Sequence, residues 1–120
     1  MFHRKINKLL DYVTSDKIAV GIDKHIIQQF KHGGKFLPFL SVYGDTFAEA
    51  IQKAFGTVDY KNAKAILVYY HLNQSTTPTD IDTAMEIIRS NTDENCNILF
   101  ALDNNRPEGV RVQIVATRKH

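Results

Sequence analysis

The most apolar stretch of the chain, residues 65–71, contains alanine, isoleucine, leucine, valine and two tyrosines before a final histidine. It shows no alternation of polar and apolar positions, which a strand with one face in water would show. The pattern therefore predicts a strand that is covered on both faces at the centre of a sheet. Two more strands are expected over residues 96–102 and 110–117, and the turn-rich residues 103–109 predict that these two pair as a hairpin.

An earlier stretch, residues 36–43, is also rich in aromatic and β-branched side chains. It contains Pro38, which has no amide hydrogen to donate to a neighbouring strand. We therefore expect a fourth strand here, with Pro38 at its irregular or edge-facing start.

Apolar residues spaced at i, i+3, i+4 and i+7 predict helices, because this spacing gathers them on one helical face. The clearest helix begins at Thr77 and Pro78, where a capping side chain, a proline and the first-turn acid Asp80 follow the preferences of helix starts. Asp23 and Asp45 are expected to cap two earlier helices. The predicted helices span residues 2–13, 23–31, 45–56 and 77–91, with Ile26, Ile27 and Phe30 facing inward on the second, and with Gly33-Gly34 and Gly56 ending the second and third.

Two helices followed by the order β-α-β-α-β-β predict an α+β protein, a two-layer α/β sandwich with two additional N-terminal helices. Strands separated by single helices usually run parallel through right-handed crossovers, so the four-stranded sheet should be mixed, with its two main helices packed on it. The 120 residues show no linker and no internal repeat, and we expect one domain over residues 1–120. It would divide into a helical segment, residues 1–35, and the sheet with its helices, residues 36–120.

The composition is that of an ordinary globular protein, with 43% hydrophobic and 23% charged residues. Cys96 is the single cysteine, so no internal disulfide can form, and the charged residues soon after Met1 do not fit a secretion signal. We therefore expect a cytoplasmic protein. No apolar run approaches the roughly 18 residues of a membrane helix, and no membrane association is expected.

Positive charge is concentrated in residues 1–36, where seven lysines and arginines stand against three aspartates, while the whole chain has a formal net charge of +2. A basic face can attract nucleic acid. Here the cations are interleaved with carboxylates and hydrophobic residues, and no aromatic stacking pattern accompanies them. An ordinary solvated face is therefore the preferred interpretation, and nucleic acid is not expected as a partner.

Residues that could carry chemistry are scattered along the chain. The five histidines lack the close spacing of a zinc site, and no glycine-rich phosphate loop or nucleophile elbow occurs, so neither a metal nor a cofactor is expected. Cys96 precedes an apolar strand and is interpreted as packing material rather than as a nucleophile. Asp80, Asp82 and Glu86 line the exposed side of the last helix, where helix-dipole support and solubility are favoured over a docking face for a basic partner.

The last predicted strand reads Val-Arg-Val-Gln-Ile-Val-Ala-Thr over residues 110–117 and resembles the final strand of the carboxy-terminal domain of FtsZ, the bacterial tubulin-like cell-division GTPase. Residues 65–71 and 81–100 are similar to the preceding strand, helix and strand of that family, and residues 43–50 to the turn and helix before them. The ordered set over residues 40–117 implies a tubulin/FtsZ carboxy-terminal-domain-like fold that stands alone without the GTPase domain.

Residues 17–24 lie where FtsZ carries its synergy loop. In that family, an asparagine and two aspartates of the loop reach the nucleotide of the next subunit and position the hydrolytic water, and the matching positions here are Ala19, Gly21 and Lys24. None of these side chains orients water as a carboxylate does, so the loop is expected to be catalytically silent. Shifting the alignment by one residue would place Asp23 at the last position and would not restore the others.

The resemblance also leaves parts of FtsZ without a counterpart. The nucleotide-binding domain with its glycine-rich loop and the terminal anchor peptide have no match, so we do not expect the chain to bind GTP as the family does. The family uses this domain in filament contacts, which implies a non-catalytic protein-interaction module that caps or modulates an FtsZ-type cell-division polymer, or that self-associates as a homo-oligomer. The docking face would combine residues 17–24 and 77–91, with candidate interface residues Asp80, Asp82, Glu86 and Arg89.

An enzymatic alternative stays open. The architecture is shared with chorismate-mutase-like trimers that bind anionic substrates between subunits, and Arg89, Arg111 and Arg118 could clamp carboxylates there. The chain could also be an excised piece of a longer protein.

Overall fold

The computed structural model describes residues 4–32 and 35–118, which form four helices and five strands. The helices are α1 (Arg4–Val13), α2 (Lys24–Lys31), α3 (Phe47–Thr57) and α4 (Pro78–Ser90). The strands are β1 (Lys35–Phe36), β2 (Leu40–Gly44), β3 (Ala63–Leu72), β4 (Asn97–Asn104) and β5 (Val110–Arg118). The predicted α+β class, with two additional helices at the N-terminus, is confirmed.

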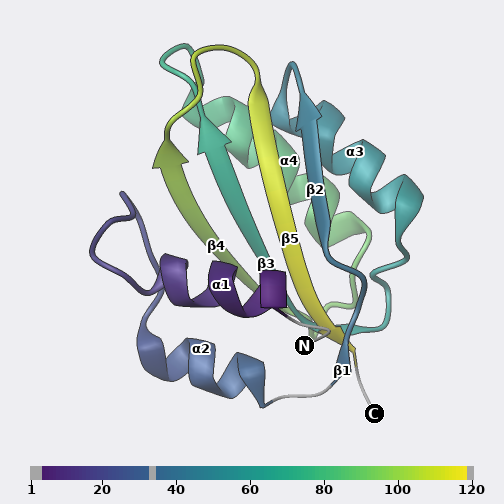
Figure 1. The fold of residues 1–120 in the computed structure, drawn as a ribbon. Helices are drawn as coiled ribbons and strands as arrows, with labels where there is room; N and C mark the ends of the chain where they lie inside the picture. The colour runs from purple at the N-terminus through teal and green to yellow at the C-terminus, as the bar shows by residue number, and fades with distance from the viewer. Residues whose placement is uncertain (1–3, 33–34, 119–120) are drawn as a thin grey trace.

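All five strands join one mixed sheet (Figure 1). β3 lies between β4, which runs parallel to it, and β5, which runs antiparallel. On its other side β5 pairs antiparallel with both β1 and β2. Residues 65–71 of β3 are therefore interior to the sheet, as predicted, and every one of them is buried.

The strand predicted over residues 36–43 is split in two, so the sheet has one strand more than expected. β1 and β2 both pair with β5, but the segment around Pro38 leaves the ladder between them. Proline has no amide hydrogen to donate to β5. The neighbouring Leu37 N donates to Ala116 O of β5 at 2.8 Å. The prediction that Pro38 marks an irregular position is confirmed.

The predicted hairpin between the last two strands is wrong, because β5 is inserted between β2 and β3. β5 is mostly buried on both faces and fits an interior position, whereas the half-exposed β4 stays at the edge. The connection between them crosses the end of β3, where Arg106 N donates to Leu72 O at 2.9 Å and Asn73 Nδ2 donates to Gly109 O at 2.7 Å. Gly109 has a φ of 66°, a conformation that glycine adopts without a steric penalty.

Helices cover both faces of the sheet (Figure 1). α3 and α4 pack on one face and bury the larger core, in which the rings of Phe47 and Tyr70 meet edge to face at 4.9 Å. α1 and α2 lie across part of the other face and bury a second core with Leu67, Tyr69 and Val115. The two N-terminal helices thus add a partial layer that covers the second face of β3 and β5.

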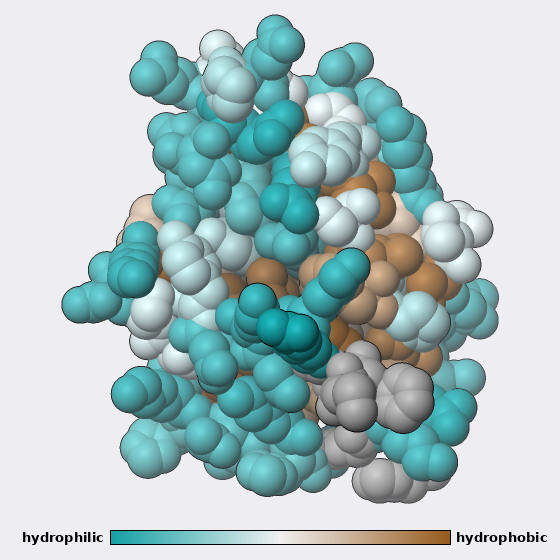
Figure 2. Space-filling model, viewed as in Figure 1, coloured by the Kyte–Doolittle hydropathy of each residue, from teal (hydrophilic) through white to brown (hydrophobic). Residues whose placement is uncertain are grey.

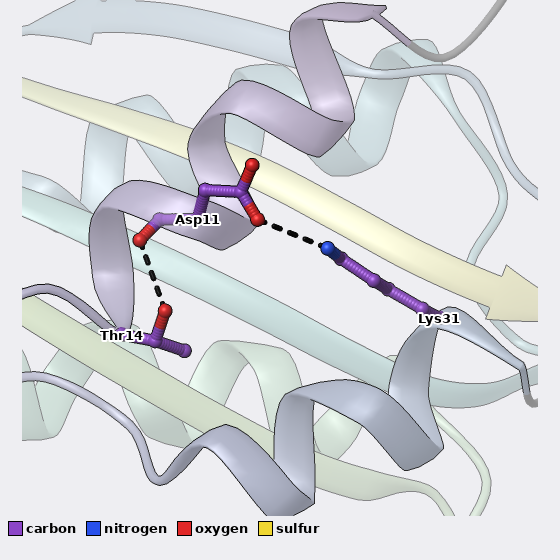
Figure 3. Close-up of polar contacts among 3 residues, drawn as sticks. All are labelled: Asp11, Thr14 and Lys31. Carbon is purple, nitrogen blue, oxygen red and sulfur yellow. Dashed lines mark hydrogen bonds and ion pairs between the residues drawn. The ribbon is translucent and has the colours of Figure 1, made fainter.

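An ion pair joins the two N-terminal helices. Lys31 Nζ at the end of α2 lies 3.0 Å from Asp11 Oδ1 on α1 (Figure 3). Thr14 Oγ1 donates to Asp11 O at 2.9 Å and supports the last turn of α1. Ile26, which was predicted to face inward, is instead 40% exposed, because α2 touches the sheet through Ile27 and Phe30.

The helix starts follow the capping rules, with one correction. Asp23 caps α2 as predicted, since its Oδ1 accepts from His25 N at 2.7 Å. α3 is capped by Thr46 rather than by Asp45, because it is the Thr46 Oγ1 that accepts from Glu49 N, at 3.2 Å. Gly56 lies inside α3, which ends at Thr57. The predicted stop of α2 at Gly33-Gly34 lies outside the described residues.

The surface on the α1 side of the molecule is mainly hydrophilic, with an apolar area around β2 (Figure 2). None of the helices formed by the described residues has the length and the apolar character needed to span a bilayer.

Candidate functional site

A hollow of about 330 Å³ lies between α4 and the edge strand β4. Its floor includes Phe100, which is 44% exposed although it is a large apolar side chain. Phe100 pairs with Val68 in the parallel ladder and so points to the α4 side of the sheet. The other lining residues are Ile81, Asp82, Met85, Glu86 and Arg89. We call this surface the α4 hollow: an apolar floor with two carboxylates and one guanidinium around it.

Asp80 has a different position from the other predicted interface residues. Its carboxylate Oδ2 accepts from Thr77 N at 3.4 Å, and its own N donates to Thr77 Oγ1 at 3.4 Å. This reciprocal pair is a capping box, which satisfies amides that the first turn of α4 leaves unpaired. The structure therefore brings Asp82, Glu86 and Arg89 together at the α4 hollow and places Asp80 in the cap of the helix.

Residues 17–24, the predicted counterpart of the synergy loop, fold against α1 and the edge of β4. Val20 and Leu102 exchange two backbone hydrogen bonds of 3.0 and 2.9 Å. Ile22 N donates to Val13 O at 2.9 Å, and a Cβ added at Gly21 would lie 2.5 Å from that same oxygen. Gly21 is therefore required by this close approach of two backbone segments. Among the predicted loop positions, Ala19, Gly21 and Lys24 are all exposed.

The three arginines of the alternative anion site are not gathered within one chain. Arg111 and Arg118 lie near opposite ends of β5, seven residues apart, which corresponds to about 23 Å along a strand. Arg89 lies in the last turn of α4, on the other face of the sheet from Arg111. A clamp made from these residues would need more than one subunit, so it stays a prediction about an assembly.

A second depression, of about 470 Å³, lies between α1 and the sheet. We call it the α1 groove. One wall is the side of α1, and the other walls come from β2, β3, β5 and the connection before β5. The lining residues are Lys5, Lys8, Leu9 and Tyr12 of α1, with Phe39, Ser41, Tyr69, His71, Asn105, Arg111 and Gln113.

His71 lies on the floor of the α1 groove and is 6% exposed. Its Nε2 lies 2.8 Å from Gln113 Oε1, and its Nδ1 lies 3.1 Å from Asn105 Nδ2. Nδ1 also lies 3.2 Å from Asn105 Oδ1, so both ring nitrogens have polar partners, and the contact of Nε2 with the Gln113 carbonyl oxygen is one in which Nε2 donates. Burial lowers the pKa of His71 below its ordinary value, so the ring is held neutral.

Two further hydrogen bonds fix the polar floor of the α1 groove. Tyr69 Oη donates to Asp103 Oδ2 at 3.1 Å, and burial together with this bond raises the pKa of Tyr69. Arg111 Nε donates to Ser41 Oγ at 2.9 Å. The side chains of this floor are therefore fixed in position, with the phenol protonated and the imidazole neutral.

The described residues show no group of three or more histidine, cysteine, aspartate or glutamate side chains that could hold a metal ion. Cys96 is half-buried at the entry to β4 and packs beside the larger core.

Known proteins resemble this chain in their fold. No protein-family model matches the sequence, and no curated protein does. Among solved structures, an empty FtsZ dimer from M. jannaschii matches 90% of this chain with a TM-score of 0.73 at 19% identity. The chain has the fold of an FtsZ carboxy-terminal domain. A single-residue mutant of M. jannaschii FtsZ matches 94% of the chain with a TM-score of 0.74 at 21% identity.

The chain spans about a third of the length of these FtsZ structures, 34% and 37%.

Within this FtsZ-like fold, neither the α1 groove nor the exposed Phe100 was predicted from the sequence. The available signal was the alternation of Arg111 and Gln113 with buried apolar residues along β5, which predicts a polar side for that strand. The sequence does not show that α1 stands opposite these residues, because that contact depends on how the first helix folds back onto the sheet.

Proposed function

We propose that the chain is a non-catalytic protein-interaction module that docks through the α4 hollow onto a subunit of an FtsZ-type polymer, and that it caps or modulates that polymer. The observation that carries the proposal is Phe100, a large apolar side chain that stays 44% exposed beside two carboxylates. An apolar centre with a charged rim is the usual anatomy of a protein contact.

The rim supports a partner of defined chemistry. Asp82 and Glu86 are one helical turn apart on α4 and repel each other unless a cation lies close to them. A partner that offers a lysine or arginine to these two carboxylates and an apolar side chain to Phe100 would relieve both the repulsion and the exposure. Arg89 at the end of α4 could bind a carboxylate of the same partner.

The backbone edge of β4 extends the proposed contact. Val20 covers this edge at Leu102, and the part of the strand near Phe100 lies beyond that bridge. The predicted docking segments, residues 17–24 and the exposed side of α4, thus both adjoin β4. The FtsZ-like fold supports an FtsZ-type subunit as the partner, since a protein of this fold has been solved as an FtsZ dimer.

The test is a filament assay with FtsZ from the same organism. The wild-type chain should change filament length and GTP turnover of that FtsZ, as measured by sedimentation, electron microscopy and phosphate release. Asp82→Lys combined with Glu86→Lys should remove the effect, because the rim would then repel a basic partner. The matched control, Glu94→Lys with Glu108→Lys, reverses two exposed acids that do not line the hollow and should act like wild type.

The proposal would be overturned if the wild-type chain left both filament length and turnover unchanged. Light scattering of the isolated chain covers the version in which the partner is a second copy. In that case a dimer should form, and Asp82→Lys with Glu86→Lys should dissociate it.

A further inference from the structure

We propose that the α1 groove binds a small organic anion, a carboxylate or phosphate group attached to an aromatic or otherwise apolar body. The groove has a volume of about 470 Å³, which lies within the range of small-molecule sites in proteins. It opens on the face of the sheet opposite to the α4 hollow, so the inference is independent of the proposed docking function.

The charged side chains that line the α1 groove all have one sign. Lys5 and Lys8 stand three residues apart on α1 and so share one side of the helix, and Arg111 extends from β5 on the other wall. None of the described residues that line the groove is an aspartate or a glutamate. The nearby Asp103 already accepts from Tyr69 at 3.1 Å. An oxyanion between the two walls would be attracted by all three cations.

Arg111 is held in position for such a ligand. Its Nε donates to Ser41 Oγ at 2.9 Å, and its guanidinium carbon lies 5.4 Å from the ring centre of Tyr43. The bond to Ser41 uses only Nε, so the two terminal nitrogens remain as a donor pair. Because a guanidinium fixed in this way loses little freedom on binding, it is suited to a planar carboxylate or a phosphate.

The floor of the groove differs in character from the rest of this sheet face. Where helices cover the face, the side chains are apolar, as at Ala65, Leu67 and Val115. At the groove, the same face carries His71 and Gln113, joined by a hydrogen bond of 2.8 Å. Polar groups on a covered sheet face are costly unless they are bonded, and the bond between His71 and Gln113 keeps a polar floor in the groove.

The walls also offer a surface for the body of the ligand. The rings of Tyr12 and Tyr69 lie 6.2 Å apart and nearly parallel, and Phe39 lines the groove from the segment before β2. Since both ring nitrogens of His71 are engaged, the floor has no vacant acid or base. The arrangement is therefore that of a binding site rather than of a catalytic one.

The experiment titrates the full chain with benzoate, phenyl phosphate, inorganic phosphate and the neutral benzyl alcohol, followed by amide NMR shifts and calorimetry. We expect saturable binding of phenyl phosphate or benzoate with a dissociation constant of about 1 mM or below, and no saturation by benzyl alcohol. The shifting amides should be those of α1 residues 5–12 and of the strand residues around Tyr69 and Arg111.

Variants separate a built site from general attraction to a basic surface. Lys5→Gln with Lys8→Gln should weaken binding about tenfold or more, and Arg111→Gln should do the same. The control, Lys17→Gln with Lys61→Gln, removes the same charge from exposed positions outside the groove and should leave the affinity unchanged. Circular dichroism checks that each variant is folded, and the lysine variants, which alter exposed side chains only, keep the test decisive if Arg111→Gln fails to fold.

Three results would overturn the inference. The first is that no anion causes saturable shifts up to about 10 mM. The second is that the control pair weakens binding as much as the groove lysines do, which would show diffuse attraction. The third is that inorganic phosphate binds as tightly as phenyl phosphate while benzoate does not bind. That result would exclude a site for the body of the ligand.

Discussion

His71 Nε2 and Gln113 Oε1 lie 2.8 Å apart and join the two central strands, β3 and β5, beneath helix α1. Both side chains lie where this sheet face changes from the apolar area under the helices, at Leu67 and Val115, to the polar floor of the α1 groove. The pair therefore links the stability of the sheet centre to the protonation state of one histidine.

Acidification should destabilise the fold through His71. Burial lowers the pKa of His71 from its ordinary value of 6.5, so below pH 6.5 the unfolded chain binds a proton that the folded chain resists. Stability from this group is thus complete above pH 6.5 and falls as the pH drops toward the lowered pKa. The nearby Arg111 opposes the charged ring, while Asp103 favours it and limits the loss.

Urea unfolding at about pH 7.5 and about pH 5.5 measures this loss, and His71→Gln should remove most of the difference between the two values. A variant with the same pH dependence as wild type would show that other groups cause it.

Gly21→Ala should destabilise the protein, whereas Gly56→Ala should stabilise it. At Gly21 the new Cβ would lie 2.5 Å from Val13 O and 2.8 Å from Ile18 Cγ2, and such overpacking costs about 1–3 kcal/mol. At Gly56, in the last turns of α3, a Cβ meets nothing within 4 Å, and alanine is favoured in a helix by about 0.5–1 kcal/mol. Chemical unfolding of both variants checks the opposite signs, and equal effects would contradict the assigned contacts.

Tyr60→Phe should raise the stability or leave it unchanged. The Tyr60 hydroxyl is buried and has no hydrogen-bond partner in the described structure, while its ring packs against Phe55 at 4.7 Å. Removing an unpaired buried hydroxyl removes a desolvation cost of about 1–3 kcal/mol and keeps the ring contact. The thermal midpoint and the urea midpoint measure the change, and a clear loss of stability would show that the hydroxyl has a partner.

Variants of the capping box and variants of the rim of the α4 hollow should affect different properties, stability in the first case and the filament effect in the second. Thr77→Ala should cost about 1 kcal/mol of unfolding free energy, because Thr77 loses its bond from Asp80 N, and it should leave the effect on FtsZ filaments intact. Asp82→Lys with Glu86→Lys should have the opposite profile, with a small change in stability and loss of the filament effect. If Thr77→Ala is folded under the assay conditions and still loses the filament effect, the docking surface includes the helix cap.

The helices and most strands could be predicted from the sequence because their signals are local. The capping box of Thr77 and Asp80, the cap at Asp23 and the interruption at Pro38 all depend on residues within a few positions of one another. The proposal that α4 is a docking helix came instead from the resemblance to FtsZ, because its charges alone are interpreted as helix-dipole support and solubility. Phe100 was missed as a surface residue because its exposure depends on β4 lying at the sheet edge.

The sequence by itself determined the α+β class, the interior position of β3 and the resemblance to an FtsZ carboxy-terminal domain. Only the tertiary structure placed β5 between β2 and β3. Two strands that follow each other in sequence have the same local pattern whether or not they pair, so the pattern does not show their neighbours. The tertiary structure also brought α1 over the sheet, where Lys8 faces Arg111 across a groove although about a hundred residues separate them in sequence. Contacts of that separation depend on the packing of the whole chain, which no local spacing of residues records.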